Sequence, residues 1–232
     1  MSTAYVINLD ERTDRWNNLQ ADWKGAFPLV RVPAVRASPG WKGCALSHIK
    51  VIEEAHARGE AYVLAWEDDC TPRNRHPRAI FELWNEVLYK LSLHTDKWDV
   101  VLGATSRAFK GTIFNQLLST QHVKLHDLPH GFTTHWTLWN VANTYDRLMQ
   151  YKATLDEQID VYMFKTFRVK LVTPFLAEQR MGHSDIENSV LDYKWMFDGA
   201  ELEITARSTG SLGDVLRFGK LACVQTPKFI AR

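Results

Sequence analysis

Glu67, Asp68 and Asp69 form a run of three acids that directly follows the apolar stretch 61–66. Adjacent carboxylates repel one another, so their ionised forms need a cation to offset the charge. Oxygen ligands suit Mg²⁺ or Mn²⁺, which bind one or two carboxylates and complete their coordination with water and substrate phosphates. Side chains alternate along an extended segment, so Glu67 and Asp69 are expected on one face and Asp68 on the other. The run predicts a divalent-metal site, with a solvated acidic turn before Thr71 as the alternative.

The apolar stretch 61–66 predicts a β-strand, because its residues do not alternate with polar ones. A strand of this kind is buried on both faces, as at the centre of a parallel sheet covered by helices. In open α/β sheets, ligands bind in the crevice outside the carboxyl ends of the strands. The three acids are therefore expected at the edge of the sheet where a ligand binds.

Two arginines follow the first predicted strand, residues 5–9. The helix expected from about residue 11 to 23 places Arg12 and Arg15 on one face, because residues three apart are neighbours on a helix. Arginine side chains beside the carboxyl end of a strand can bind a diphosphate or a nucleotide base. Ordinary surface pairing with adjacent acids is the alternative, and taken alone this segment favours it.

The N-terminal half has the element order of a nucleotide-binding sheet. A second short strand is expected over 29–35, and the segment 43–48 opens a helix that precedes the strand 61–66. The order strand, helix, strand, helix, strand indicates a parallel α/β sheet with right-handed crossovers.

The C-terminal half continues with helical and extended patterns and ends in a region without a persistent period. The expected elements are a helix over 81–91, strands at 98–103, 122–125 and 132–138, helices over 141–151 and 157–168, and extended segments at 169–173 and 175–177. A polar cluster with several acids and a histidine follows at 181–189. From residue 195 onward, four glycines interrupt the pattern, which predicts an irregular extension packed on the body or partly mobile.

The composition excludes several classes of partner. The chain has 232 residues, 45% of them hydrophobic, which is enough for one good-sized core. Its 28 basic and 27 acidic residues leave a formal charge of +1, which indicates neither nucleic acid nor a membrane surface as a partner. We also expect no transmembrane segment and no signal peptide. Three widely spaced cysteines indicate reduced thiols, so a cytoplasmic protein is expected.

Taken in order, these segments resemble glycosyltransferase family 25, which includes bacterial lipopolysaccharide galactosyltransferases and the collagen hydroxylysine galactosyltransferases. The resemblance covers roughly residues 4–190, and its most specific part is the pair of motifs Gly-Cys-Ala-Leu-Ser-His (43–48) and Glu-Asp-Asp (67–69). The other matching segments are the first strand with Arg12 and Arg15, residues 99–103, Thr133-Thr134, Asp160, Pro174 with Gln179, and 184–187.

The family resemblance implies a GT-A fold, that is, an α/β fold with a mostly parallel central sheet flanked by helices. It also implies a UDP-sugar donor, UDP-galactose or UDP-glucose, and inverting transfer of the hexose to a hydroxyl group of a glycan, glycolipid or glycoprotein, as in lipopolysaccharide biosynthesis. We expect one catalytic domain over 1–195, with a nucleotide-sugar-binding half (1–103), an acceptor half (104–195) and the irregular extension 196–232. Trp66 departs from the family pattern, which more often has a smaller aliphatic residue there.

The resemblance also implies roles for individual residues. The Glu-Asp-Asp run is similar to the Asp-x-Asp motif of GT-A enzymes, which implies that Asp68 and Asp69 bind Mn²⁺ or Mg²⁺. His183 is implied as a third metal ligand, with a structural histidine as the alternative. The residues implied at the nucleotide side are Asn8, Leu9, Arg12, Arg15, Ser47 and Glu67. For Ser47, helix packing against the first strand is the alternative.

Inverting transfer needs a general base that takes the proton of the acceptor hydroxyl. The resemblance implies two candidates, Asp160 and Asp185, of which we favour Asp160. The alternative for Asp160 is an acid stabilised by the dipole at a helix N-terminus. Asp185 could equally cap a helix or bind the donor sugar.

Two other classes of function stay open. A sugar-nucleotide-binding module that has lost turnover predicts donor binding without transfer. A different metal-dependent nucleotide enzyme, such as a nucleotidyltransferase, predicts a glycine-rich phosphate loop after the first strand, and residues 8–11 contain no glycine. The sequence therefore argues more strongly against a nucleotidyltransferase than against a silent module, and the intact acids favour an active transferase.

Overall fold

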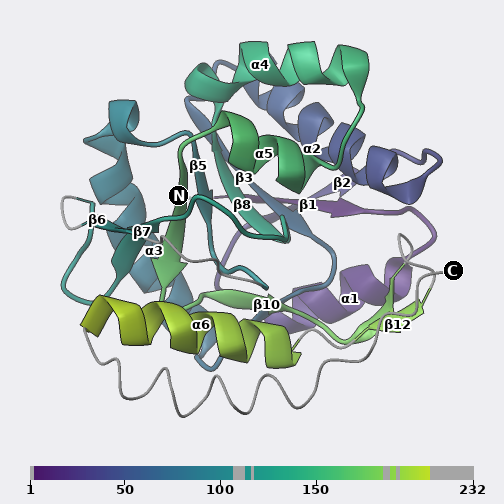
Figure 1. Cartoon of the computed structure of the whole chain (residues 1–232). Helices are drawn as coiled ribbons and strands as arrows, with labels where there is room; N and C mark the ends of the chain where they lie inside the picture. Colours follow the sequence, from purple (N-terminus) through teal and green to yellow (C-terminus); the bar gives the residue numbers. More distant parts are fainter. Residues whose placement is uncertain (1–2, 107–112, 116–117, 185–188, 192–193, 210–232) are drawn as a thin grey trace, which may run out of the picture.

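The computed structural model in Figure 1 describes residues 3–106, 113–115, 118–184, 189–191 and 194–209. The elements of the N-terminal part are β1 (Ala4–Asn8), α1 (Thr13–Asp22), β2 (Leu29–Pro33), α2 (Gly40–Ala57), β3 (Tyr62–Glu67), β4 (Cys70–Pro72), α3 (Pro77–Ser92), the 3-10 helix η1 (Thr95–Lys97) and β5 (Val100–Leu102). They are followed by β6 (Ile113–Asn115), β7 (Lys124–Asp127), β8 (Trp136–Asn140), α4 (Val141–Thr154), α5 (Ile159–Thr166), β9 (Val169–Thr173), β10 (Ala177–Gln179), β11 (Gly182–Ser184), β12 (Ser189–Leu191) and α6 (Lys194–Thr209).

Eight of the described strands form a central sheet with the order β2-β1-β3-β8-β5-β9-β7-β6, and β4 with β10 and β11 with β12 form two small sheets. β1 pairs in parallel with β2 and β3, and β5 pairs in parallel with β9. β8 runs antiparallel between β3 and β5, and β7 is antiparallel to β9 and β6. Six of these eight strands therefore point in one direction. The predicted fold class, α/β with a mostly parallel central sheet flanked by helices, is confirmed.

Helices cover both faces of the sheet, because successive residues of a strand point to opposite sides. Ile7 of β1 and Ala65 of β3 belong to a first core that includes buried residues of α2, α4 and α5. Their neighbours Val6 and Trp66 belong to a second core that includes buried residues of α1 and α3. Figure 1 shows α2, α4 and α5 together on one side of the sheet and α1 on the other.

Trp66 lies in the second core among other aromatic rings. Its ring centroid is 4.4 Å from that of Trp136, its partner on β8, and 4.6 Å from that of Trp23. Gly103 makes room for this packing, since a Cβ at that position would lie 2.5 Å from the Trp136 ring. The large residue directly before the acids therefore fills the core.

Residues 194–209 form the helix α6, so the predicted irregular extension is wrong for this segment. Phe197, Ala200 and Ile204 are buried and belong to the first core. Their spacing is helical, but the exposed Gly199 between them obscures the period in the sequence. The rest of the predicted extension, residues 210–232, lies outside the described residues.

A buried arginine joins α6 to the small sheet formed by β4 and β10. Arg73 directly follows β4 and is 2% exposed. Its guanidinium donates hydrogen bonds to Glu178 in β10 and to Asp198 and Glu201 in α6. The distances are 2.6 Å from Nη2 to Asp198 Oδ1 and 2.9 Å from Nε to Glu201 Oε2. These ion pairs fix α6 on the body of the protein.

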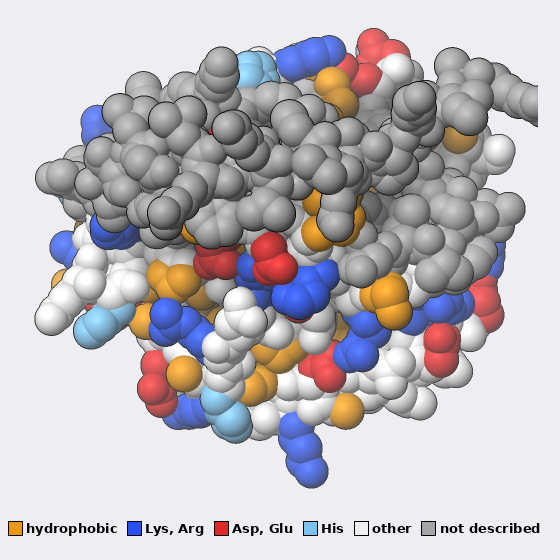
Figure 2. All heavy atoms as spheres, turned by 60° about the horizontal axis from the view of Figure 1, so that its bottom comes forward, with side chains coloured by type: hydrophobic (Ala, Val, Ile, Leu, Met, Phe, Trp, Pro, Cys, Tyr) orange, Lys and Arg blue, Asp and Glu red, His pale blue; other side chains and the backbone are white. Residues whose placement is uncertain are grey.

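The surface carries mixed charges. Figure 2 shows a face on which the described acidic and basic side chains lie beside one another and beside exposed hydrophobic ones. This mixture agrees with the formal net charge of +1. In the part of the chain that the structure describes, no helix combines the length and the apolar character needed to cross a membrane.

We expect Arg73→Met to lower the free energy of unfolding by about 3 kcal/mol, because removing one partner of a buried ion-pair cluster leaves the others uncompensated. Urea unfolding of the wild type and the variant measures this difference. Arg75→Met is the matched control, since Arg75 is an exposed arginine two residues along the chain. Equal losses of stability in the two variants would contradict the role assigned to Arg73.

The buried His126 is expected to make the folded protein less stable at acid pH. It is 1% exposed in β7, and its Nε2 lies 2.7 Å from Thr173 Oγ1 in β9. Burial, assisted by Lys124, lowers the pKa of His126 from 6.5 to about 4. The unfolded chain therefore takes up a proton that the folded protein does not bind until about pH 4. The stability that neutral His126 contributes is complete above about pH 6.5 and falls between there and about pH 4.

Urea unfolding of the wild type and His126→Gln at several pH values between about 7 and 4.5 tests this expectation. Glutamine keeps a hydrogen-bonding group for Thr173 but does not titrate, so the variant should lose less stability than the wild type as the pH falls. His122→Gln is the control, because the His122 side chain is 60% exposed. Parallel pH profiles for the wild type and His126→Gln would show that this histidine does not cause the loss.

Candidate functional site

A cavity of about 450 Å³ lies where the chain leaves the carboxyl ends of β1, β2 and β3. The acids of 67–69 line it after β3, and Ile7 and Leu9 line it at the end of β1. Residues 34–37 after β2 and the start of α5 complete this part of the wall. The cavity is thus at the edge of the sheet where the sequence predicts ligand binding.

Asp68 is held by two residues from the N-terminal part of the chain. Arg15 Nη1 lies 2.7 Å from Asp68 Oδ1, and Asn8 Nδ2 donates to Asp68 Oδ2 at 2.6 Å. Burial raises the pKa of Asp68, although the Arg15 guanidinium opposes this shift. Asn8 also accepts a hydrogen bond from Arg31 Nε at 2.7 Å. Oδ1 of Asp68 thus ties α1 to the end of β3, and Oδ2 ties the end of β1 to it.

Asp69 is the acid whose carboxylate is least compensated. Gln179 Nε2 donates to its Oδ2 at 3.3 Å, whereas Oδ1 is buried and has no hydrogen-bond partner among the described residues. Burial and the charges of Glu67 and Asp68 raise the pKa of Asp69 to about 8. A bound cation would reverse this effect, because it favours the ionised carboxylate.

The residues at Asp69 fit a hard divalent cation. The Asp69 carboxylate, with one oxygen unpartnered among the described residues, offers oxygen donors, which suit Mg²⁺ or Mn²⁺. These ions keep several positions for water and for phosphate oxygens. The cavity adjoining Asp69 provides the space for such a ligand.

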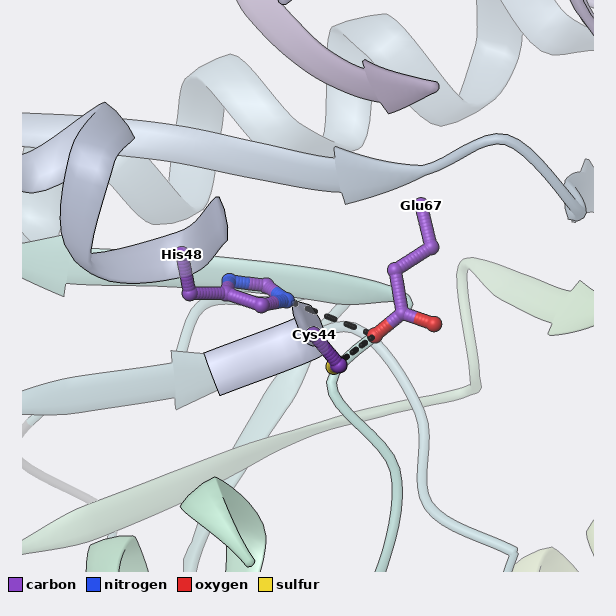
Figure 3. A group of neighbouring side chains, drawn as sticks. All are labelled: Cys44, His48 and Glu67. Carbon is purple, nitrogen blue, oxygen red and sulfur yellow. Dashed lines mark hydrogen bonds and ion pairs between the residues drawn. The ribbon is translucent and has the colours of Figure 1, made fainter. Parts of the chain in front are cut away.

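Glu67 is the centre of a second group of side chains, shown in Figure 3. Its Oε1 accepts a hydrogen bond from Thr134 Oγ1 at 2.6 Å, and His48 Nε2 lies 3.3 Å from the same oxygen. Cys44 Sγ lies 3.9 Å from it. Burial alone would raise the pKa of Glu67, but the interactions with His48 and Thr134 outweigh it and lower the pKa.

Cys44 is not an activated nucleophile. Burial and the charge of Glu67 raise the pKa of its thiol well above the ordinary value. The reactive form of cysteine is the thiolate, so the raised pKa gives Cys44 no enhanced reactivity when no metal is bound. Cys44 and Cys70 are both free thiols, as the sequence predicts, and Cys223 lies outside the described residues.

The contacts of Ser47 are internal to the fold. Its Oγ donates to the Gly43 carbonyl at 2.7 Å and accepts from the Val35 backbone N–H at 2.8 Å. Glycine is required at position 43, where α2 passes close to the chain after β2, because a Cβ there would lie 2.6 Å from the Val35 carbonyl oxygen. Ser47 borders the cavity, but these contacts fasten α2 to the chain after β2, which is the packing alternative.

The two predicted arginines have different surroundings. Arg15 lines the cavity and pairs with Asp68. Arg12 Nε lies 3.1 Å from Asp14 Oδ1, so it makes the surface pair that the sequence favoured.

Asp160 lines the cavity from the first turn of α5. Its Oδ1 accepts a hydrogen bond from the Val161 backbone N–H at 2.8 Å. Burial raises the pKa of Asp160, while the backbone N–H groups of Val161 and Thr133 act in the opposite direction. Thr133 has φ of 86°, a conformation that is strained for a threonine. Such strain is common where the chain is held in place at functional sites.

The structure leaves two predicted residues without a side-chain description. His183 lies in β11, which pairs antiparallel with β12, and the neighbouring Gly182 borders the cavity. Asp185 lies outside the described residues. Their predicted roles stay predictions.

Sequence reasoning did not bring Cys44 and His48 together with Glu67 as a group. Residues four apart on a helix lie on one face, so the spacing of Cys44 and His48 is a signal for joint action. The sequence does not show that β1 pairs in parallel with β3, or that α2 packs against these strands. These two features place this face of α2 at the end of β3.

No protein-family model and no curated protein matches this chain. Among solved structures it is similar to A197 from STIV, with a TM-score of 0.42 and 13% identity over 82% of this chain and 93% of that one. It is also similar to 4-diphosphocytidyl-2C-methyl-D-erythritol synthase from Anaerococcus prevotii, with a TM-score of 0.43 and 13% identity over 85% and 78%. For mannose-1-phosphate geranyltransferase from Thermus thermophilus the TM-score is 0.38, with 12% identity over 72% and 58%. Similarities at this level support no conclusion about chemistry.

We expect Mn²⁺ to raise the thermal unfolding temperature of the wild type, because a ligand that binds only the folded state stabilises it. Asp69→Asn should abolish the rise, since the amide oxygen carries no charge. Asp14→Asn is the control, because Asp14 is an acid whose side chain is 61% exposed. A rise that persists undiminished in Asp69→Asn would show that the cation binds elsewhere.

Proposed function

We propose that the protein is a metal-dependent inverting glycosyltransferase that moves a hexose, galactose or glucose, from a UDP-sugar to a hydroxyl group of a glycan, glycolipid or glycoprotein. The observation that carries the proposal is the buried Asp69 oxygen, which has no hydrogen-bond partner among the described residues and adjoins a cavity lined by further acids. The order of the sequence motifs supports the choice of donor and reaction.

In this proposal Asp69 holds Mn²⁺ or Mg²⁺, with Asp68 and His183 as the further ligands that the family resemblance implies. When bound, the ion offsets the negative charge that develops on the diphosphate leaving group. Arg15 has a second role besides pairing with Asp68: it keeps a positive charge at the cavity wall, which favours an anionic ligand.

The wall provides an apolar surface for the donor. Ile7, Leu9 and residues 34–37 contribute mostly apolar side chains, which suit the flat face of a base. Trp41 also lines the cavity and offers an aromatic face to a sugar or a base. By contrast, Trp136 and Trp139 are fully buried, so these two rings belong to the core.

Asp160 is our candidate for the general base. The position of its carboxylate in the cavity wall supports this role. Burial raises its pKa towards the working pH, which strengthens a carboxylate as a proton acceptor. The backbone N–H of Val161 orients the side chain. Asp185 is the second candidate from the sequence.

The experiment that tests this function measures UDP release from a panel of UDP-sugars, with Mn²⁺ or with chelator. We expect release confined to one UDP-sugar, dependent on Mn²⁺ and lost in Asp69→Asn. Asp160→Asn should lower kcat by about 10²–10⁴-fold while leaving donor affinity unchanged. Asp146→Asn, an exposed acid on α4, is the matched control and should retain full activity.

Two outcomes would contradict the proposal. Tight Mn²⁺-dependent donor binding without release, even when acceptor extracts are added, would identify a silent binding module. Failure to bind any sugar nucleotide would remove the family resemblance as a guide to function. The acceptor and the link to lipopolysaccharide biosynthesis are parts of the same proposal and are tested by identifying the glycosylated product. A cytoplasmic location is also part of it and is tested by cell fractionation.

A further inference from the structure

Three side chains of different chemistry meet at one oxygen of Glu67. Figure 3 shows the Cys44 sulfur and the His48 ring directed at the same carboxylate oxygen. The ligand atoms of Cys44, His48 and Glu67 all lie within 4.8 Å of one another. All three residues also border the cavity. The unpartnered oxygen of Asp69 is not one of the ligand atoms of this cluster of thiol, imidazole and carboxylate.

The fold holds this cluster in place from three directions. Cys44 and His48 are one helical turn apart on α2, and His48 is completely buried. Glu67 is the last residue of β3, against which α2 packs. Thr134 Oγ1 fixes the Glu67 carboxylate through a hydrogen bond of 2.6 Å. Ligands carried by packed elements and oriented by outer hydrogen bonds are typical of protein metal sites.

We propose that Cys44, His48 and Glu67 together bind one Zn²⁺ ion. In a tetrahedral zinc site the bonds to sulfur, nitrogen and oxygen are about 2.3, 2.0 and 2.1 Å long. These lengths separate nitrogen from oxygen by about 3.4 Å and sulfur from oxygen by about 3.6 Å. The distances to Glu67 Oε1 are 3.3 Å from His48 Nε2 and 3.9 Å from Cys44 Sγ, both close to these values, and the sulfur and nitrogen lie within 4.8 Å of each other.

The donor set selects zinc over the ion proposed at Asp69. Thiolate and imidazole are ligands for Zn²⁺, whereas Mg²⁺ and Mn²⁺ prefer oxygen. Binding forms a bond between zinc and the Cys44 sulfur, and the thiol proton passes to solvent. Three protein ligands leave the fourth tetrahedral position open, and because the cluster borders the cavity, water or an anionic ligand can occupy it.

Co²⁺ is the spectroscopic probe for this site, because tetrahedral Co²⁺ bound to a thiolate gives a sulfur-to-metal charge-transfer band in the near ultraviolet. We expect this band to saturate at one equivalent and to disappear when Zn²⁺ is added. Cys44→Ser should remove the band, and His48→Gln should weaken Co²⁺ binding at least about tenfold. Cys70→Ala should keep it, because Cys70 is a free thiol outside the cluster.

Asp69→Asn separates this inference from the proposed transferase function. The variant removes the oxygen site but leaves Cys44, His48 and Glu67 in place, so the charge-transfer band should persist in it. The zinc inference therefore holds or fails whether or not the protein releases UDP. Absence of the band in the wild type, or its persistence in Cys44→Ser, would overturn the inference.

A second measurement needs no variant. Cys44 is partly accessible, so iodoacetamide should alkylate it slowly in the metal-free wild type, as followed by mass spectrometry. Stoichiometric Zn²⁺ should slow alkylation at Cys44 at least about tenfold, because a coordinated thiolate is shielded. An unchanged rate of Cys44 alkylation in the presence of Zn²⁺ would overturn the proposal. Because this test uses the wild type, it remains decisive even if Cys44→Ser does not fold.

Discussion

The structure depends on how the negative charge at the end of β3 is compensated. A buried ionised group costs free energy unless it is paired or hydrogen-bonded. Arg15 and Asn8 compensate Asp68, and His48 and Thr134 compensate Glu67. Asp69 keeps one oxygen without such a partner among the described residues. The contacts of Asp68 and Glu67 hold the surrounding elements in place, whereas Asp69 has an oxygen that no described group engages.

The geometry of an extended chain divides these acids between the two layers of helices. Neighbouring side chains point to opposite sides of a strand, so Glu67 meets His48 on α2 whereas Asp68 meets Arg15 on α1. The sequence of each helix provides the partner for the acid on its side. A three-residue acidic run after a buried strand therefore fastens a helix on each side of the sheet and leaves one oxygen of Asp69 without a partner among the described residues.

The sequence predicted the features that depend on local pattern. The strand 61–66 corresponds to β3, and the acids lie at its carboxyl end in a cavity. The pairing of Asp68 with Arg15 could not be predicted, because it joins residues 53 apart. Helix α6 was missed because it is stabilised by burying Phe197, Ala200 and Ile204 in the first core, whose other residues lie far away in the sequence. Local spacing shows which residues share a face, but tertiary packing decides what that face meets.

The ion pairs of Arg73 connect the C-terminal helix to the cavity. They fasten α6 to β10, whose Gln179 contacts Asp69, and Met196 of α6 is itself part of the cavity wall. Ligand binding and helix docking are therefore linked equilibria. A molecule that fills the cavity against Met196 also holds α6 in place. By thermodynamic reciprocity, a docked α6 strengthens the binding of that molecule by the same factor.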